Sequence, residues 1–275
     1  MGITNSIMQE FAYLNGDIIG IEKAKILITD LAILRGYGVF DFFRAIDGKP
    51  IYMEDHLDRF ENSVKRMTLS LPCTREHLRQ NILDLIKLNP HNLLGIKLLC
   101  TGGYSEDGYT PTTPNLMMLA KPFKMQPHDK ELKLMTVRHI RELPDIKTIN
   151  YITPISLLPQ LKAVNADDVL YHFNGQISES SRANIFIVKN EKIITPKANI
   201  LRGVTRAHIL KLAENNFDVE VRNVKLKEVF EADEAFLSGS TRRITFVKHI
   251  DHQTFHSRKI TDKINALLMK NEKDI

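Results

Sequence analysis

The sequence predicts an α+β protein built of two domains. Strand-like and helix-like segments occur in both halves and are mixed rather than strictly alternating, which favours α+β over a doubly wound sheet. At 275 residues the chain is long enough for two domains with cores of their own. Residues 121–130 hold two prolines and several charges without periodicity. We therefore expect a linker there, between an N-terminal domain at 1–120 and a C-terminal domain at 131–275.

The composition is that of an ordinary globular protein, with 43% hydrophobic and 26% charged residues. The net charge of +5 is spread along the chain, which predicts a mild preference for anionic ligands and no nucleic-acid partner. No apolar run approaches the length of a membrane span, so no membrane partner is expected. Cys73 and Cys100 form no CxxC motif, which favours a reducing, cytoplasmic location.

The first fifty residues predict two hairpins around a bend. Asn15-Gly16 interrupts the apolar stretch 11–21, and Asp47-Gly48 splits 42–51; both dipeptides favour tight turns. Between them, glycines flank Tyr37, which indicates a bent backbone close to another group.

The rest of the N-terminal half predicts two helices and two strands. Apolar residues recur at helical spacing over 54–67 and 75–88, whereas 93–100 and 116–120 are apolar enough to be buried strands. The Gly/Tyr-rich loop 101–111 joins these strands. Such a loop either carries substrate contacts or is a plain surface connection.

The C-terminal half predicts the same mixture. Asn174-Gly175 indicates a hairpin after a strand at 168–173. The other expected elements are strands at 132–137 and 193–196 and helices at 154–164, 204–215 and from 259 onward.

Two segments within 177–206 carry the most information. Glu179 opens a polar run that ends at Asn184 and leads into an apolar strand. Further on, Leu201-Arg202-Gly203-Val204-Thr205-Arg206 is a glycine-bearing turn feeding a helix. Free backbone N–H groups at such a helix start suit a phosphate.

These segments resemble those of the fold-type IV pyridoxal-phosphate enzymes, the class IV aminotransferases. Their pattern of Glu, four residues, Asn and an aromatic strand matches Glu179, Asn184 and Phe186, and their Leu-x-Gly-[Ile/Val]-Thr-Arg turn matches 201–206. His56-Leu57-Asp58-Arg59 and 232–241 match further motifs, so the resemblance covers most of the chain. It implies a D-amino acid aminotransferase-like fold of two α+β domains with the cofactor between them. It also implies a homodimer in which each partner contributes to the other's site.

Pyridoxal phosphate requires a lysine, a partner for the pyridine nitrogen, a phosphate cradle and orientation. By resemblance, Lys147 is the catalytic lysine that carries the cofactor, in an Ile-Lys-x-x-Asn context within the C-terminal domain. Its apolar neighbours Ile146 and Ile149 favour a nucleophilic amine. Glu179 is the acid that pairs with the pyridine nitrogen. Without the resemblance, Lys147 reads as a surface lysine and Glu179 as a strand-end carboxylate.

The resemblance also supplies the remaining cofactor contacts. Arg59 adds charge to the phosphate site, although the same residue also reads as a solvated helix arginine. Leu201 is expected beneath the ring, and Tyr151 near its phenolic oxygen. The phosphate contacts are expected from Gly203, Val204, Thr205 and Thr241. No metal is expected.

The chain departs from its relatives where they bind the substrate carboxylate. The usual Arg-x-His trap is replaced by Thr101-Gly102-Gly103-Tyr104, and Ile33 stands where a tyrosine is usual. Arginine is well suited to grip a carboxylate with two parallel bonds. We therefore expect Arg35 and Arg182 to bind the substrate with Tyr37, and Arg35 to do so across the dimer. The alternative is that both arginines pair with acids at the surface.

The leading prediction is a transaminase that moves an amino group between an α-amino acid and a 2-oxo acid such as 2-oxoglutarate. The α-amino acid is expected to be a D-amino acid or a branched-chain amino acid. The first alternative is 4-amino-4-deoxychorismate lyase, which would use the same Lys147 and Glu179. A cofactor-binding protein without turnover is the third possibility.

Overall fold

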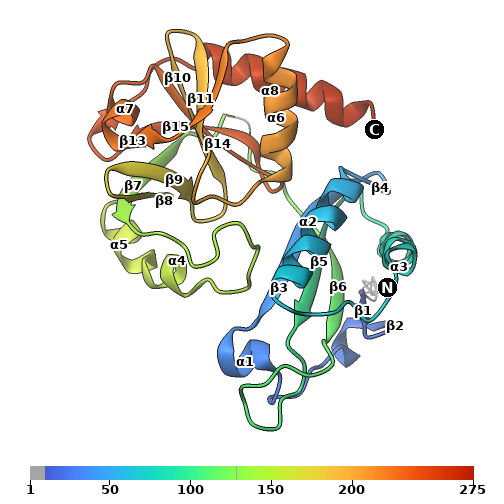
Figure 1. Ribbon diagram of the computed structural model, residues 1–275. Helices are drawn as coiled ribbons and strands as arrows, with labels where there is room; N and C mark the ends of the chain where they lie inside the picture. Colours follow the sequence, from blue (N-terminus) through green and yellow to red (C-terminus); the bar gives the residue numbers. More distant parts are fainter. Residues whose placement is uncertain (1–9, 128) are drawn as a thin grey trace, which may run out of the picture. The chain divides into compact units, whose positions relative to one another are not determined.

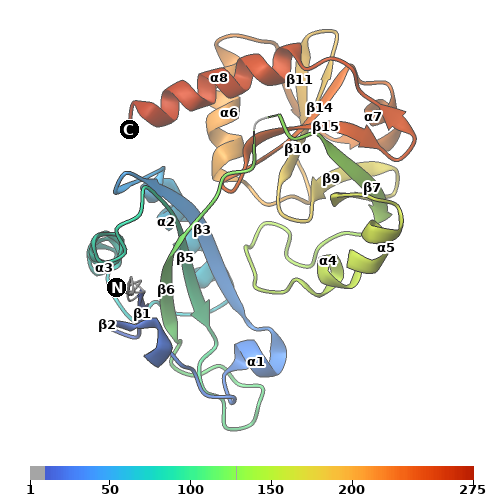
Figure 2. The same cartoon turned by 180° about the vertical axis from the view of Figure 1, so that it is seen from behind.

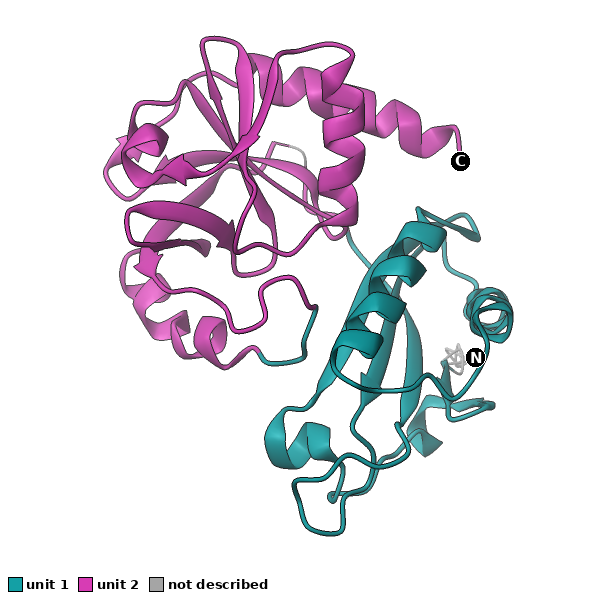
Figure 3. Cartoon of the chain, viewed as in Figure 1, with its two compact units in different colours: residues 1–124, 147–150 teal, residues 125–146, 151–275 magenta. Residues whose placement is uncertain are grey.

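The computed structural model describes residues 10–127 and 129–275 and divides into two compact units (Figures 1 and 3). Unit 1 comprises Met1–Lys124 and Lys147–Asn150, and unit 2 comprises Met125–Ile146 and Tyr151–Ile275. Both units mix strands and helices, which confirms the predicted α+β class.

The segment that holds Lys147 belongs to unit 1 by its contacts. The N–H of Phe40 donates to the carbonyl oxygen of Lys147 across 2.9 Å, and Ile149 N–H donates to Gly38 O across 3.1 Å. These bonds attach residues 147–150 to β3 (Gly38–Ile46). The domain ranges expected from the sequence stay a prediction, and here the contacts group the chain differently.

Unit 1 is built on an antiparallel sheet with the strand order β2-β1-β6-β5-β3-β4. The predicted hairpins are present, and Asn15 and Asp47 take the positive φ that their turns require. Helix α2 lies along one face of the sheet in both views (Figures 1 and 2). The elements of unit 1 are β1 (Phe11–Leu14), β2 (Asp17–Gly20), the 3-10 helix η1 (Ile21–Lys23), α1 (Leu31–Arg35), β3, β4 (Lys49–Pro50), α2 (Met53–Arg66), α3 (Arg75–Leu88), β5 (Leu93–Thr101) and β6 (Leu116–Pro122).

The short helix α1 was not predicted. The buried carboxylate of Asp30 accepts the N–H of Ala32 and so caps its first turn, while Gly36 ends it in the left-handed conformation at φ 63°. The bend expected around Tyr37 therefore begins with one helical turn.

Unit 2 contains a strand ring closed by a single pairing. Strands β10, β14, β15, β7, β8 and β9 follow one another, and Asn184 of β10 pairs back with Glu179 of β9. The elements of unit 2 are β7 (Leu132–Arg138), α4 (Ile152–Ser156), α5 (Leu158–Ala163), β8 (Asp168–Phe173), β9 (Gln176–Ser180), β10 (Asn184–Lys189), β11 (Lys192–Pro196), α6 (Val204–Glu214), β12 (Val219–Arg222), β13 (Val224–Lys225), α7 (Leu226–Phe230), β14 (Glu234–Gly239), β15 (Arg243–Ile250), β16 (Gln253–Thr254) and α8 (Lys259–Lys273).

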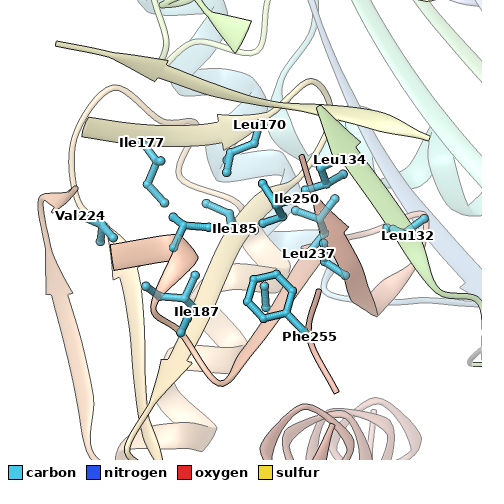
Figure 4. Close-up of a cluster of buried hydrophobic side chains, with 14 of the residues drawn as sticks. Leu132, Leu134, Leu170, Ile177, Ile185, Ile187, Val224, Leu237, Ile250 and Phe255 are labelled. Atoms are coloured by element: carbon cyan, nitrogen blue, oxygen red, sulfur yellow. The ribbon is translucent and has the colours of Figure 1, made fainter. Parts of the chain in front are cut away.

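Apolar side chains from all six strands of this ring fill its interior (Figure 4). Leu170, Ile185 and Leu237 are each fully buried there, as in a small barrel packed with side chains. The closing pair, Glu179 with Asn184, therefore sits on a rigid support.

One predicted helix is broken in two. Residues 154–164 were expected to form a single helix, but the structure has α4 and α5. Pro159 near the start of α5 has no N–H to donate to Ile155 O, so the helical bonding is interrupted there. The helix expected at 204–215 is α6, and it lies beside α8 in both views (Figures 1 and 2). In the described part of the chain, no helix is long and apolar enough to cross a membrane.

Candidate active site

The residues expected at the site fall into two sets, one in each unit. The set in unit 1 is Arg35, Tyr37, Arg59 and Lys147. The set in unit 2 is Tyr151, Glu179, Arg182, Leu201, Gly203, Val204, Thr205 and Thr241.

In unit 1, Arg59 is held by a forked ion pair. Its Nε and Nη2 each donate across 2.8 Å to the two oxygens of Asp41, which lies on β3. His56, one helical turn earlier on α2, places Nδ1 2.7 Å from Asp41 Oδ1. Since the Arg59 side chain is only 12% exposed, it is not a solvated helix arginine.

The charges of this cluster are fixed by burial and pairing. Burial alone would raise the pKa of Asp41, but Arg59 and His56 hold that pKa well below its usual range. Burial lowers the pKa of His56, and the cations of Arg59 and Lys147 act in the same direction against the pull of Asp41. Nη1 of Arg59 makes no hydrogen bond to any residue that the structure describes. That nitrogen is therefore open to an anion.

Lys147 is half-buried and lies against an aromatic ring. Its Nζ is 4.5 Å from the centroid of the Phe40 ring, and Lys97 lies 5.5 Å from the same centroid. Ile146, just before it, is buried. The lysine thus has an aromatic ring and a buried isoleucine beside it, and its catalytic role stays a prediction.

The two other unit 1 residues differ in how they are engaged. Tyr37 donates its hydroxyl to the carbonyl of Met67, which leaves its ring for other contacts. Arg35 is exposed and donates to the carbonyl of Leu34.

In the Gly/Tyr-rich loop 101–111, Asp107 accepts four hydrogen bonds from Ser105, Tyr109 and Thr110, and these bonds stabilise the loop.

In unit 2, the residues of the Glu179 motif lie together. Glu179 is 4% exposed, and its Oε2 accepts the backbone N–H of Leu201 across 2.9 Å. The side-chain amide of Asn184 donates to Leu201 O across 2.8 Å and approaches Glu179 Oε2 at 3.4 Å. The spacing of Glu and Asn along the sequence is thus explained by the strand pairing that closes the barrel.

Arg141 is a neighbour of this site that the sequence did not reveal. Its Nε donates to Glu179 Oε1 across 2.8 Å. A buried carboxylate is tolerated when such a cation and hydrogen bonds offset its desolvation. No motif marks Arg141, and nothing in the sequence distinguishes it from Arg138.

The N-terminus of α6 has the features of an anion site. Val204 and Thr205 are buried at its first positions, and Gly203 at the N-cap brings no side chain to bond the free amides. A Cβ on Gly203 would lie 2.2 Å from Asn184 Oδ1, so only glycine fits this close approach. Among the described residues, no side chain caps these amides, which leaves them available to a ligand.

Four further residues of unit 2 are expected at the site, namely Thr241, Leu201, Tyr151 and Arg182. Thr241 is half-buried in the turn between β14 and β15, where Arg242 N–H donates to Gly239 O. Leu201 is half-buried, and Tyr151 stands at the N-cap of α4. Arg182 is exposed between β9 and β10.

Each unit by itself contains groups of the kind that pyridoxal phosphate requires. Unit 2 offers a buried carboxylate for the ring nitrogen and uncapped helix amides for a phosphate, and unit 1 offers a lysine and an arginine with an open nitrogen. In the described part of the chain, no cluster of three or more His, Cys, Asp or Glu side chains is arranged to hold a metal.

The chain is similar to known proteins over most of its length. Residues 38–250 match the family described as amino-transferase class IV. A putative branched-chain-amino-acid aminotransferase of Methanocaldococcus jannaschii is 30% identical over 276 residues, covering 96% of this chain and 95% of the relative. A D-alanine aminotransferase of Staphylococcus haemolyticus is 28% identical, covering 90% and 92%.

The fold is also that of a solved enzyme. The branched-chain aminotransferase from the thermophilic archaeon Thermoproteus uzoniensis, solved with norvaline, superposes with a TM-score of 0.88 at 24% identity. The match covers 96% of this chain and 95% of that one. The predicted fold type is thereby confirmed.

Proposed function

Because the chain belongs to the class IV aminotransferases, we propose that it transfers the amino group of a D-amino acid or branched-chain amino acid to a 2-oxo acid such as 2-oxoglutarate, using pyridoxal 5'-phosphate. Its substrates are amino acids and 2-oxo acids, as in other aminotransferases. The relatives reported above are named as transferases, which favours transfer over the lyase reaction.

One observation carries this proposal. Glu179, buried at the barrel closure, is bonded directly to the turn that opens α6, through Leu201 N–H. The group for the ring nitrogen and the amides for the phosphate are therefore set by one short stretch of backbone. A single ligand with a basic ring and a phosphate matches both.

Each residue then has a defined task. Bound pyridoxal phosphate supplies an electron sink for the pair left when the substrate loses its α-proton. Lys147 Nζ would hold the cofactor and, once the substrate's amino group has displaced it, would be free to take up and return the α-proton. Glu179 keeps a proton on the ring nitrogen. The phosphate would be held by Arg59, Val204 N–H, Thr205 N–H and Thr241. Leu201 would contact the ring, and Tyr151 would donate to its phenolic oxygen.

Substrate binding is assigned to Arg35 and Arg182, with the ring of Tyr37 beside them. Both arginines are exposed, which leaves their guanidinium groups available for a carboxylate. Arg35 acts from a second copy in a homodimer. Exposed apolar side chains such as Ile28, Ile33 and Ile152 support such an interface. The free thiols of Cys73 and Cys100 support a cytoplasmic location.

The test is a half-reaction assay. The holoprotein is mixed with matched L- and D-amino acids, and the change in cofactor absorbance is followed before 2-oxoglutarate is added. Transfer requires the spectrum to change with the amino acid and to return with the 2-oxo acid. Pyruvate release from 4-amino-4-deoxychorismate without this return would establish the lyase instead, and an unchanging spectrum with every substrate would refute turnover.

A further inference from the structure

The turn that carries Thr241 is tied to the last helix of the chain. Arg243, two residues after Thr241, donates from Nε to Glu272 Oε2 across 2.5 Å. Glu272 lies in the final turn of α8, and its side chain is only 2% exposed. The bond thus joins residues 29 positions apart and fixes one arm of the turn.

Glu272 is an unfavourable residue for its position on two counts. Burial of a carboxylate costs solvation, and the C-terminal end of a helix carries partial negative charge that repels it. A carboxylate there needs a cation close by, and Arg243 provides one. The pair is therefore not an incidental surface contact, because Glu272 by itself would weaken the end of α8.

Arg243 also has a backbone conformation that is costly for its type. Its φ is 55°, in the left-handed region that residues with a side chain adopt rarely. The strain is maintained by the surrounding contacts, of which the bond to Glu272 is one. The shape of the 239–243 turn is consequently set by packing rather than by local preference.

Helix α8 contacts the two elements that carry the predicted phosphate site, α6 directly and the 239–243 turn through Arg243. It lies beside α6, whose first residues are Val204 and Thr205, in both views (Figures 1 and 2). Through Glu272 it also holds the turn that carries Thr241. A single helix thus connects the two elements that are expected to grip the phosphate.

We propose that Arg243 and Glu272 are positioning residues that hold the Thr241 turn in place relative to the N-terminus of α6, so that both grip one cofactor phosphate. Neither residue touches the cofactor in this scheme. The inference rests on the proposed role of Thr241 in phosphate binding.

The experiment compares two ligands that differ only in the phosphate. Binding of pyridoxal 5'-phosphate and of pyridoxal to the apoprotein is measured by fluorescence for the wild type, Arg243→Asn and Glu272→Gln. Asparagine tolerates the left-handed conformation, so Arg243→Asn removes the charge without adding backbone strain. Asp262→Asn is the matched control, because Asp262 lies in the first turn of the same helix and pairs with Arg258 at its N-cap.

We expect both variants to raise the dissociation constant of pyridoxal 5'-phosphate about tenfold and to leave that of pyridoxal within about twofold. Arg243→Lys keeps the positive charge and should bind pyridoxal 5'-phosphate nearly as tightly as the wild type. Asp262→Asn should leave the dissociation constants of both ligands unchanged. If the variants bind both ligands equally less tightly, or bind both as tightly as the wild type does, the positioning role is wrong. Thr241→Val is measured in parallel. If it binds pyridoxal 5'-phosphate as tightly as the wild type, the proposed phosphate site itself is wrong. If it binds less tightly but Arg243→Asn and Glu272→Gln do not, only the positioning role of Arg243 and Glu272 is wrong.

Discussion

Arg141 and Glu179 form a largely buried ion pair, with Nε and Oε1 2.8 Å apart, although 38 positions separate them in the sequence. Glu179 is also bonded to Leu201 N–H, so one carboxylate joins three segments of unit 2. We expect this pair to matter both for stability and for the reaction, and the two effects are separable.

Glu179→Gln should retain the cofactor but slow the half-reaction roughly a hundredfold, because a neutral amide no longer keeps the ring nitrogen protonated. Arg141→Met should instead cost about 3 kcal/mol of unfolding free energy, since it leaves Glu179 buried without its cation. Denaturant unfolding of the two variants and of the double variant measures this. If the double variant is as unstable as the sum of the single variants, the pairing is not what stabilises the site.

Lys147 is expected to carry the cofactor. Borohydride reduction of the holoprotein followed by peptide mapping should place the label on Lys147, and Lys147→Ala should abolish both label and transfer. Lys97→Ala is a close control, because Lys97 lies 5.5 Å from the centroid of the same Phe40 ring and should leave labelling intact. Label on Lys97 in the wild type would reverse the assignment.

Gly203→Ala should weaken retention of pyridoxal 5'-phosphate at least about tenfold. The added Cβ would meet Asn184 Oδ1 at 2.2 Å, and Asn184 in turn holds Leu201. The wild type serves as the control. Dialysis of the holoproteins gives the loss rates, and equal rates for the wild type and the variant would argue against the close approach.

Arg35→Ala and Arg182→Ala should each raise the amino acid concentration needed for the half-reaction, without releasing the cofactor. A lost charged hydrogen bond to the substrate carboxylate costs about 1.5–3 kcal/mol. Arg79→Ala is the control, because Arg79 is an arginine on α3 engaged with Glu54 and Glu76. Unchanged kinetics in both test variants would exclude them as the carboxylate trap, and an effect confined to L-substrates would exclude D-amino acids.

Stability is expected to fall as the pH drops below about 6.5, partly through His56. The folded state lowers the pKa of His56, so just below pH 6.5 the unfolded chain binds a proton there that the folded chain does not. One such proton makes the unfolding free energy fall by up to about 1.4 kcal/mol for each pH unit of acidification. His56→Gln should flatten this slope between pH 6.5 and acid unfolding. An identical pH profile of unfolding free energy in the variant would show that the folded state does not lower the pKa of His56.

The sequence was sufficient wherever local rules decide structure. Asn15-Gly16 and Asp47-Gly48 require positive φ and formed the predicted hairpins. The α2 helix was predictable from apolar spacing, because its buried face repeats with the helical period. The break between α4 and α5 was not predicted, because the apolar pattern continues across Pro159 although the helical hydrogen bonding does not.

Long-range pairing was beyond local rules. The spacing of Glu179 and Asn184 indicated a site, but the barrel closure that brings them together depends on six strands. Arg141 and the Asp41 partner of Arg59 were not predicted for the same reason, since each bond joins segments that are distant in sequence. The roles of the site residues themselves stay predictions.

The pairing of β7 with β15 determines when unit 2 can be completed during synthesis. Thr136 at β7 bonds Asp251 across 115 positions, and β15 runs parallel to β7 beside it. A nascent chain that ends before β15 thus presents β7 with an open, apolar edge, which is prone to pair with other chains. Ribosome-bound or truncated chains that lack β15 are therefore expected to aggregate more readily than the full chain.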